Sequence, residues 1–227
     1  MLVFVAAERR ELEGLLVHVE EVSKPDWPLD FARVGLLHGA RVVMVANGPG
    51  PKLAATAVDI VKQHTEMTGL ISVGFCGGLK PELQGGDIFV ATEVVGFGPA
   101  LPVTSRKSFR QGRLLSIDRV ISTAAEKNEL GKAGADAVEM EAAAVATRAR
   151  DWNVPFYAVR VVTDTSVETF PLEFNHMRSG DGRFSRFKIL RAALRRPFAV
   201  FPELIKLNSK TKRAARALGD FLADSRF

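Results

Sequence analysis

Short apolar runs alternate along this chain with segments in which apolar residues recur every three or four positions. The runs are typical of buried strands, and the spacing is typical of helices that cover a sheet. Because several runs are apolar on both faces, we expect an α/β fold: a three-layer sandwich with a mostly parallel, mixed central sheet. The predicted strands are residues 2–6, 41–46, 70–73, 88–95, 114–117, 135–138 and 156–162, and the predicted helices are 8–19, 53–63, 123–131 and 140–152.

Three segments do not fit this alternation. Residues 20–30 contain two prolines and are predicted to form a loop, and residues 96–113 are rich in Gly, Pro and Ser, which is typical of a long surface loop. Residues 183–227 mix apolar and basic side chains, and Pro197 and Pro202 are expected to break them into short helices.

The composition favours one main domain without a membrane span, a disulfide or a metal site. A chain of 227 residues that is 47% hydrophobic can bury one sizeable core. No segment approaches the ~18 consecutive apolar residues of a membrane span, and no secretory signal is recognisable at the start, so we expect a cytoplasmic protein. The single cysteine, Cys76, excludes an intrachain disulfide, and the four histidines are scattered, so neither a metal site nor a cofactor is expected.

Charge is distributed unevenly. Residues 183–227 contain twelve Lys and Arg against three acids, a net charge of +9, whereas the whole chain carries +5; residues 1–182 therefore carry −4. We expect a catalytic domain at 1–182 and a basic amphipathic helical extension at 183–227. The extension predicts peripheral contact with an anionic membrane surface. The alternative is helices packed on the body or a neighbouring subunit with a solvated basic face. No stripe of aromatic residues lies among the basic ones to stack bases, so nucleic acid is not expected.

The strongest candidates for chemistry are two carboxylates. Glu141 is predicted at the start of a helix, where it could accept hydrogen bonds from two vicinal hydroxyls. Asp164 follows a buried strand, where desolvation would raise its pKa toward that of a usable acid. The alternatives are a first-turn glutamate that complements the helix dipole and an aspartate that caps a helix or turn.

Three further segments lie where ligands gather in an open α/β sheet, at the carboxyl ends of predicted strands. After the first strand, Glu11 could activate water, or Arg9 and Arg10 could hold an anion such as phosphate. The small residues of 47–51 and 74–78 would let the backbone approach a ligand closely. A solvated first helical turn and ordinary strand-to-helix turns explain the same residues.

Residues 134–164 carry a family resemblance. GADAVEMEAAAVA at 134–146 and VPFYAVRVVTD at 154–164 resemble the signature of the nucleoside phosphorylases and nucleosidases, which include the methylthioadenosine/adenosylhomocysteine nucleosidases; GFCGGL at 74–79 is similar to their glycine-rich substrate loop. The resemblance implies a nucleoside phosphorylase-like fold, a purine nucleoside substrate, cleavage of the N-glycosidic bond, and a homo-oligomer.

The resemblance also implies roles for individual residues. Glu141 would hold the 2′ and 3′ hydroxyls of the ribose, Met140 would pack on the sugar, and Asp164 would donate a proton to N7 of the departing purine. Further residues would complete the pocket: Phe75, Cys76 and Gly77 along sugar and base, Arg160 and Thr163 in support of Asp164, the main chain near Val120 at the base edge, and Phe170 or Phe174 as a closing side chain.

The attacking group stays open between water and phosphate. Hydrolases of this family use a glutamate soon after the first strand, and Glu11 aligns with it. Phosphorylases collect arginines around phosphate, and Arg9, Arg10 and Arg106 are the candidates.

The basic extension resembles the branch of the family that acts in hopanoid lipid biosynthesis and removes adenine from adenosylhopane. The alternatives are a hydrolase of methylthioadenosine, adenosylhomocysteine or futalosine, and, in another class, a non-catalytic membrane-binding protein on the same fold.

Overall fold

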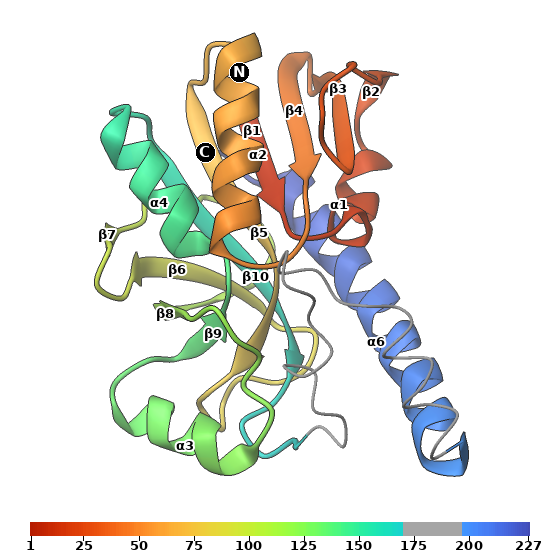
Figure 1. The fold of residues 1–227 in the computed structure, drawn as a ribbon, viewed down its shortest axis with the longest axis vertical. Helices are drawn as coiled ribbons and strands as arrows, with labels where there is room; N and C mark the ends of the chain where they lie inside the picture. Colours follow the sequence, from red (N-terminus) through yellow and green to blue (C-terminus); the bar gives the residue numbers. More distant parts are fainter. Residues whose placement is uncertain (170–196) are drawn as a thin grey trace.

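The computed structural model describes residues 1–169 and 197–227, and between 197 and 208 only the course of the backbone. It contains a ten-stranded sheet with helices around it (Figure 1). The elements are β1 (Leu2–Ala6), α1 (Arg9–Leu16), β2 (Glu20–Ser23), β3 (Phe31–Leu37), β4 (Ala40–Ala46), α2 (Pro51–His64), β5 (Gly69–Gly78), β6 (Ile88–Val94), β7 (Gly98–Pro99), β8 (Arg110–Ser116), α3 (Ala124–Lys132), β9 (Ala137–Glu139), α4 (Ala142–Asp151), β10 (Phe156–Asp164) and α6 (Pro197–Asp224).

The sheet is mixed. Its strand order is β10-β6-β8-β9-β5-β1-β4-β3-β2, and β10 also pairs with β5, so that β5, β10, β6, β8 and β9 form a closed ring. Strand β1 lies parallel to both β4 and β5, and β10 lies parallel to β5, whereas β3 and β2 extend the open edge in antiparallel fashion. The parallel strands β1, β4, β5 and β10 therefore end on the same side of the sheet.

Strand β1 shows how the sequence pattern becomes a core on both faces of the sheet. Val3 and Val5 pack in one hydrophobic cluster, and Phe4 and Ala6 in the other, because successive side chains of a strand point to opposite faces. Helices α2 and α4 contribute to the first cluster, and α1 and α6 contribute to the second. These helix pairs lie on different sides of the sheet (Figure 1).

The sequence reading missed part of the sheet. Strand β2 lies within the segment predicted as a loop, β3 was not predicted, and β8 begins four residues earlier than expected, at Arg110. Strand β3 contains Arg33 and Gly35 and lacks a continuous apolar run; its full antiparallel register with β4 holds it in the sheet. The glycine-rich segment after residue 73 continues β5 to Gly78 instead of forming a turn.

The C-terminal segment also differs from expectation. Helix α6 begins at Pro197 and continues through Pro202, so the predicted break at Pro202 is wrong. Pro197 lies in the first turn, where N–H groups lack partners within the helix anyway; Pro202, the sixth residue, costs one backbone hydrogen bond, and the helix continues past it. The predicted boundary between 182 and 183 lies outside the described residues. No helix among those described is long and apolar enough to cross a membrane.

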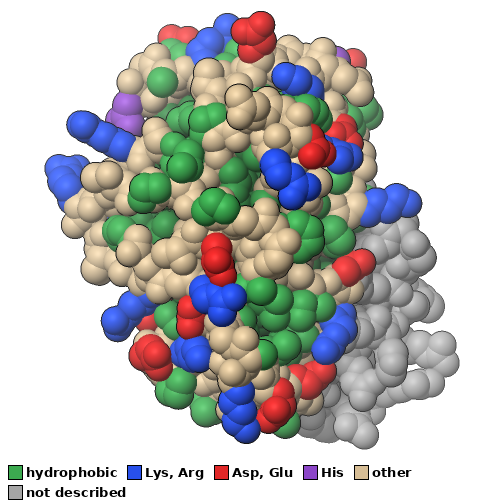
Figure 2. All heavy atoms as spheres, turned by 90° about the vertical axis from the view of Figure 1, so that its left-hand side faces the viewer, with side chains coloured by type: hydrophobic (Ala, Val, Ile, Leu, Met, Phe, Trp, Pro, Cys, Tyr) green, Lys and Arg blue, Asp and Glu red, His purple; other side chains and the backbone are tan. Residues whose placement is uncertain are grey.

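The last turns of α6 belong to the protein core. Leu218, Phe221 and Leu222 are completely buried against α1 and the sheet. A Cβ atom built on Gly219 would overlap the backbone of Gly14, so the two helices cross at close range where both residues lack a side chain. On the side of the molecule that carries α4 and β7, which is the left-hand side in Figure 1, apolar side chains lie at the surface among charged ones (Figure 2).

Candidate active site

A cavity of about 210 Å³ opens at the carboxyl ends of the parallel strands. In open α/β sheets this edge is the usual position of a ligand site. The cavity is lined by residues after β1, after β4, at the end of β5, before α3, around the start of α4 and at the end of β10: Ala7, Glu8, Arg10, Glu11, Pro49, Phe75, Cys76, Gly77, Arg119, Val120, Ile121, Val138, Glu139, Met140, Glu141, Thr163 and Asp164.

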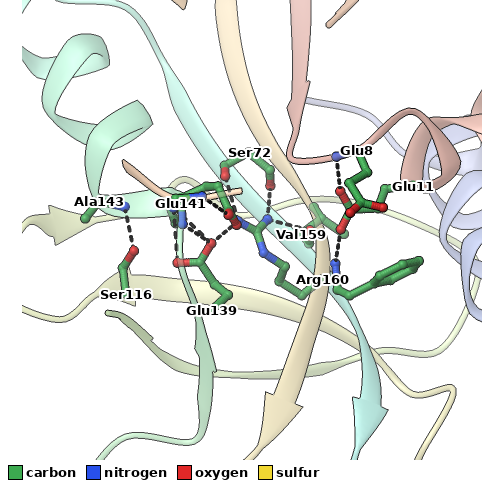
Figure 3. A network of polar contacts seen from close by, with 12 residues as sticks. Glu8, Glu11, Ser72, Ser116, Glu139, Glu141, Ala143, Val159 and Arg160 are labelled. Carbon is green, nitrogen blue, oxygen red and sulfur yellow. Dashed lines mark hydrogen bonds and ion pairs between the residues drawn. The ribbon is translucent and has the colours of Figure 1, made fainter. Parts of the chain in front are cut away.

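Glu11 lies in the first turn of α1, and backbone groups hold both of its carboxylate oxygens (Figure 3). The N–H of Glu8 donates to Oε2 at 2.7 Å, and the N–H of Phe75 donates to Oε1 at 2.9 Å. Burial raises the pKa of Glu11, and these two hydrogen bonds oppose the rise. The carboxyl group is thus fixed in position, and burial makes its carboxylate more basic than that of an exposed glutamate.

Glu141 is the N-cap residue of α4 and is buried. Its Oε1 accepts a hydrogen bond of 2.7 Å from the N–H of Gly50, in the turn after β4. Burial raises the pKa of Glu141 to about 8, and the neighbouring carboxylates Glu139 and Glu11 contribute to the rise. Three carboxyl groups therefore lie near one another in this cavity.

Glu139 and Arg160 form a buried ion pair that supports the start of α4 (Figure 3). Glu139 accepts hydrogen bonds from the N–H groups of Glu141 and Ala142, both at 2.9 Å to Oε2. The guanidinium of Arg160 donates to the same oxygen at 2.5 Å and to the hydroxyl of Ser72 at 2.7 Å. The pair therefore fixes the backbone that carries Glu141.

Asp164 ends β10, and both of its oxygens have partners. The hydroxyl of Thr163 donates to Oδ1 at 3.0 Å, and the ammonium of Lys127 lies 2.6 Å from Oδ2. Burial raises the pKa of Asp164, and Lys127 opposes the rise. Of the two residues expected beside Asp164, Thr163 contacts it. Arg160 instead pairs with Glu139 and lies outside the residues that line the cavity, because its guanidinium reaches the start of α4.

The predicted phosphate-binding arginines do not come together. Arg10 lines the cavity, with its guanidinium 5.9 Å from the ring centre of Phe75. Arg9 does not line it; its side chain pairs with Glu13 on the exposed side of α1. Arg106 lies elsewhere, because Asp224 near the end of α6 binds its guanidinium at 2.6 Å.

The other predicted residues that the structure describes line the cavity: Met140, Phe75, Cys76, Gly77 and Val120. Burial raises the pKa of Cys76, which therefore carries a thiol and not a thiolate. Phe170 and Phe174 lie outside the described residues. Within the described part of the chain, no group of His, Cys, Asp and Glu could hold a metal ion.

Sequence reasoning missed Lys127 and Glu139. Glu139 stands two positions before Glu141 in the quoted signature, so the repeated glutamate was an available signal. Lys127 lies in a polar helix, AAEKNELGK, where nothing in the pattern distinguishes it from an exposed lysine.

A mixed α/β sheet with buried carboxyl groups gathered at its strand ends matches the architecture that the sequence resemblance implied. The sequence profile of the Phosphorylase superfamily matches residues 5–108 and 101–192, and the chain therefore belongs to this superfamily. It is an enzyme of the nucleoside phosphorylase or nucleosidase type.

Individual relatives agree with this assignment. A 5′-methylthioadenosine/S-adenosylhomocysteine nucleosidase of Baumannia cicadellinicola subsp. Homalodisca coagulata is 33% identical over 162 residues, which are 57% of this chain and 71% of the relative. The fold is similar to that of the nucleosidase of the same name from Neisseria meningitidis, solved with methylthio-immucillin-A (TM-score 0.71, 23% identity, 98% and 96% of the two chains covered). The Campylobacter jejuni nucleosidase gives a TM-score of 0.71 at 16% identity, with 98% and 96% covered.

Proposed function

We propose that this protein hydrolyses the N-glycosidic bond of a 5′-substituted adenosine, such as methylthioadenosine or adenosylhomocysteine. One observation carries the proposal: Glu11, Glu141 and Asp164 come from three separate elements and line one cavity at the strand ends. The names of the relatives support the substrate class.

The proposed reaction assigns one task to each carboxyl group. Glu141 binds the 2′ and 3′ hydroxyls of the ribose, and Met140 packs on the sugar. The bond between C1′ and N9 breaks, its electron pair passes to the purine, and Asp164 donates a proton to N7. Water attacks C1′ of the oxocarbenium-like sugar while Glu11 takes its proton. General acid and base help of this kind is worth about 10² to 10⁴ in rate each.

The arrangement around Glu11 favours water over phosphate as the attacking group. The carboxyl group lies in the cavity with two backbone hydrogen bonds that fix its direction. A phosphate dianion would need several positive partners. Two of the three candidate arginines, Arg9 and Arg106, bind carboxylates outside the cavity.

Incubation with methylthioadenosine, with and without inorganic phosphate, tests the proposal. We expect free adenine and free methylthioribose at the same rate in both conditions. Glu11→Gln and Asp164→Asn should each reduce kcat by about 10² or more, whereas Glu13→Gln, on the exposed side of α1, should leave it unchanged. Phosphate-dependent formation of the sugar 1-phosphate would show phosphorolysis instead. Full activity of Glu11→Gln would show that Glu11 is not the general base that takes the proton from water.

A lipid-linked adenosine such as adenosylhopane is the second candidate substrate. The exposed face of α6 supports it: Lys212, Arg213 and Arg216 are exposed, whereas Thr211 and Ala214 are buried. Basic residues near an anionic membrane each contribute about 1 kcal/mol to binding. Co-sedimentation with phosphatidylglycerol vesicles should therefore fall for a variant with these three residues changed to Gln. Equal binding of the variant would exclude membrane contact through this face.

The apolar surface seen in Figure 2 supports a homo-oligomer. Phe97 and Leu101, on either side of β7, are 41% and 43% exposed. Contiguous apolar surface often marks contacts between proteins. Light scattering of the purified protein tests this: a monomer at micromolar concentration would exclude the assembly.

A further inference from the structure

Helix α3 places a completely buried lysine behind the cavity. The Lys127 side chain is 0% exposed. Its ammonium lies 2.6 Å from Oδ2 of Asp164 and donates hydrogen bonds of 2.9 Å to the carbonyl oxygens of Thr165 and Glu168. A buried ammonium is costly in free energy unless it is paired and hydrogen-bonded, and such lysines are rare in proteins.

All three of these partners belong to the segment 164–168, at the end of β10 and just beyond it. Lys127 therefore ties α3 to the stretch of chain that begins with Asp164. Thr163 holds the other oxygen of the same carboxyl group at 3.0 Å. The Asp164 carboxyl group is thus held from both sides while it still lines the cavity.

We propose that Lys127 is a positioning residue for the protonation of the departing purine: it orients the Asp164 carboxyl group, and its positive charge stabilises the carboxylate that proton donation leaves behind. This inference rests on the proposed function. In the step, the O–H bond of Asp164 breaks and an N–H bond forms at N7. The electron pair of the O–H bond stays on Asp164 as negative charge, facing the Lys127 ammonium.

The charges around Asp164 give the proposal a measurable consequence. Burial raises the pKa of Asp164, Lys127 lowers it, and Glu168 raises it. Cys76 of β5 also interacts with Asp164, and Lys210 of α6 lies 3.1 Å from Glu168. Loss of the Lys127 charge should therefore raise the pKa of Asp164 further and make it a weaker acid.

The pH dependence of kcat for methylthioadenosine tests this in the full-length protein. Lys127→Met removes the charge at similar side-chain length. We expect kcat to fall at least tenfold, and the alkaline limit of activity to move to higher pH because Asp164 keeps its proton longer. Lys132→Met is the matched control: Lys132 lies on the same helix with its side chain 65% exposed, and its profile should equal that of the wild type.

A second substrate separates this role from a merely structural one. A 4-nitrophenyl riboside has a leaving group that needs no proton, so Lys127→Met should cleave it at nearly the wild-type rate while losing activity on methylthioadenosine. Equal losses on both substrates, or an unchanged pH profile, would overturn the inference.

Two further measurements separate the role of Lys127 from misfolding of Lys127→Met and from a failure of the proposed function. Lys127→Arg retains the charge and should retain the wild-type alkaline limit, even if Lys127→Met does not fold; a shifted limit in Lys127→Arg would contradict the role of the charge. If the wild type releases no adenine from any 5′-substituted adenosine, the proposed function itself is wrong, and this inference is wrong with it.

Discussion

Gly77 is the position at which a single methyl group tests the geometry of the proposed acid most directly. A Cβ atom on Gly77 would lie 2.9 Å from Oδ2 of Asp164 and 3.4 Å from a methyl carbon of Val138. Ordinary contacts begin at 3.4 Å, so the carboxyl group or the strand must move by about 0.5 Å. Lys127 and Thr163 hold the carboxyl group from the other sides, which leaves it little room to retreat.

The displacement sets the size of the expected effect. A misplacement of 1 Å at a reacting group costs about 10² in rate. Half that displacement predicts a loss of about tenfold in kcat, equivalent to about 1.4 kcal/mol in the activation free energy. Since the methyl group presses on the acid and leaves Glu141 untouched, KM should change less than kcat.

Steady-state adenine release by Gly77→Ala measures the effect. Gly85→Ala is the matched control, because a Cβ atom there meets nothing within 4 Å and the backbone needs no left-handed conformation; this variant should retain wild-type kcat. A wild-type kcat for Gly77→Ala would refute the reasoning, since Asp164 would then tolerate displacement. A loss confined to KM would instead place the methyl group against the bound substrate.

Two further predictions concern stability. Gly219→Ala should lower the free energy of unfolding in urea. The new Cβ atom would lie 2.0 Å from the backbone of Gly14, so the cost should reach the upper part of the range of about 1–3 kcal/mol for overpacking and exceed the ~1 kcal/mol that alanine contributes to helix propensity; equal or higher stability would contradict the close helix crossing. Glu141 has a pKa of about 8 in the folded protein, whereas an unperturbed glutamate, as in the unfolded chain, has a pKa of 4.5. The folded state therefore retains a proton that the unfolded state releases, and the free energy of unfolding should fall as pH rises between these values. Glu141→Gln should flatten this fall; an unchanged slope would show that Glu141 titrates normally.

The sequence predicted those elements whose apolar pattern is sufficient by itself. Strands β1, β4 and β10 are buried on both faces and read as apolar runs, so their residues could be located before any pairing was known. Strand β3 depends on its pairing with β4, because Arg33 interrupts its apolar residues. Local pattern contains no information on such a partner, and the strand was missed.

The same distinction applies to the site. Glu141 and Asp164 lie within short signature segments, and both line the cavity of the structure. The partners of the buried Lys127 ammonium, Asp164, Thr165 and Glu168, lie 37 or more residues away in sequence. The guanidinium of Arg106 binds Asp224, 118 residues further on, and not a group in the cavity. A charged side chain can form an ion pair or hydrogen bonds with many different groups, and the whole fold decides which of these groups lies near it.

The three proposed reacting groups have separate supports, and this organisation bears on how mutations should combine. Glu11 is held through α1, which crosses α6 at close range; Glu141 is held by the Glu139–Arg160 pair at the start of α4; Asp164 is held by Lys127 on α3. Changes in one support therefore displace one carboxyl group and leave the other two in place. Because effects at sites without shared partners usually add, losses at Lys127 of α3 and at Gly219 of α6 should combine additively in the free energy of activation, whereas losses at Lys127 and Asp164 should not.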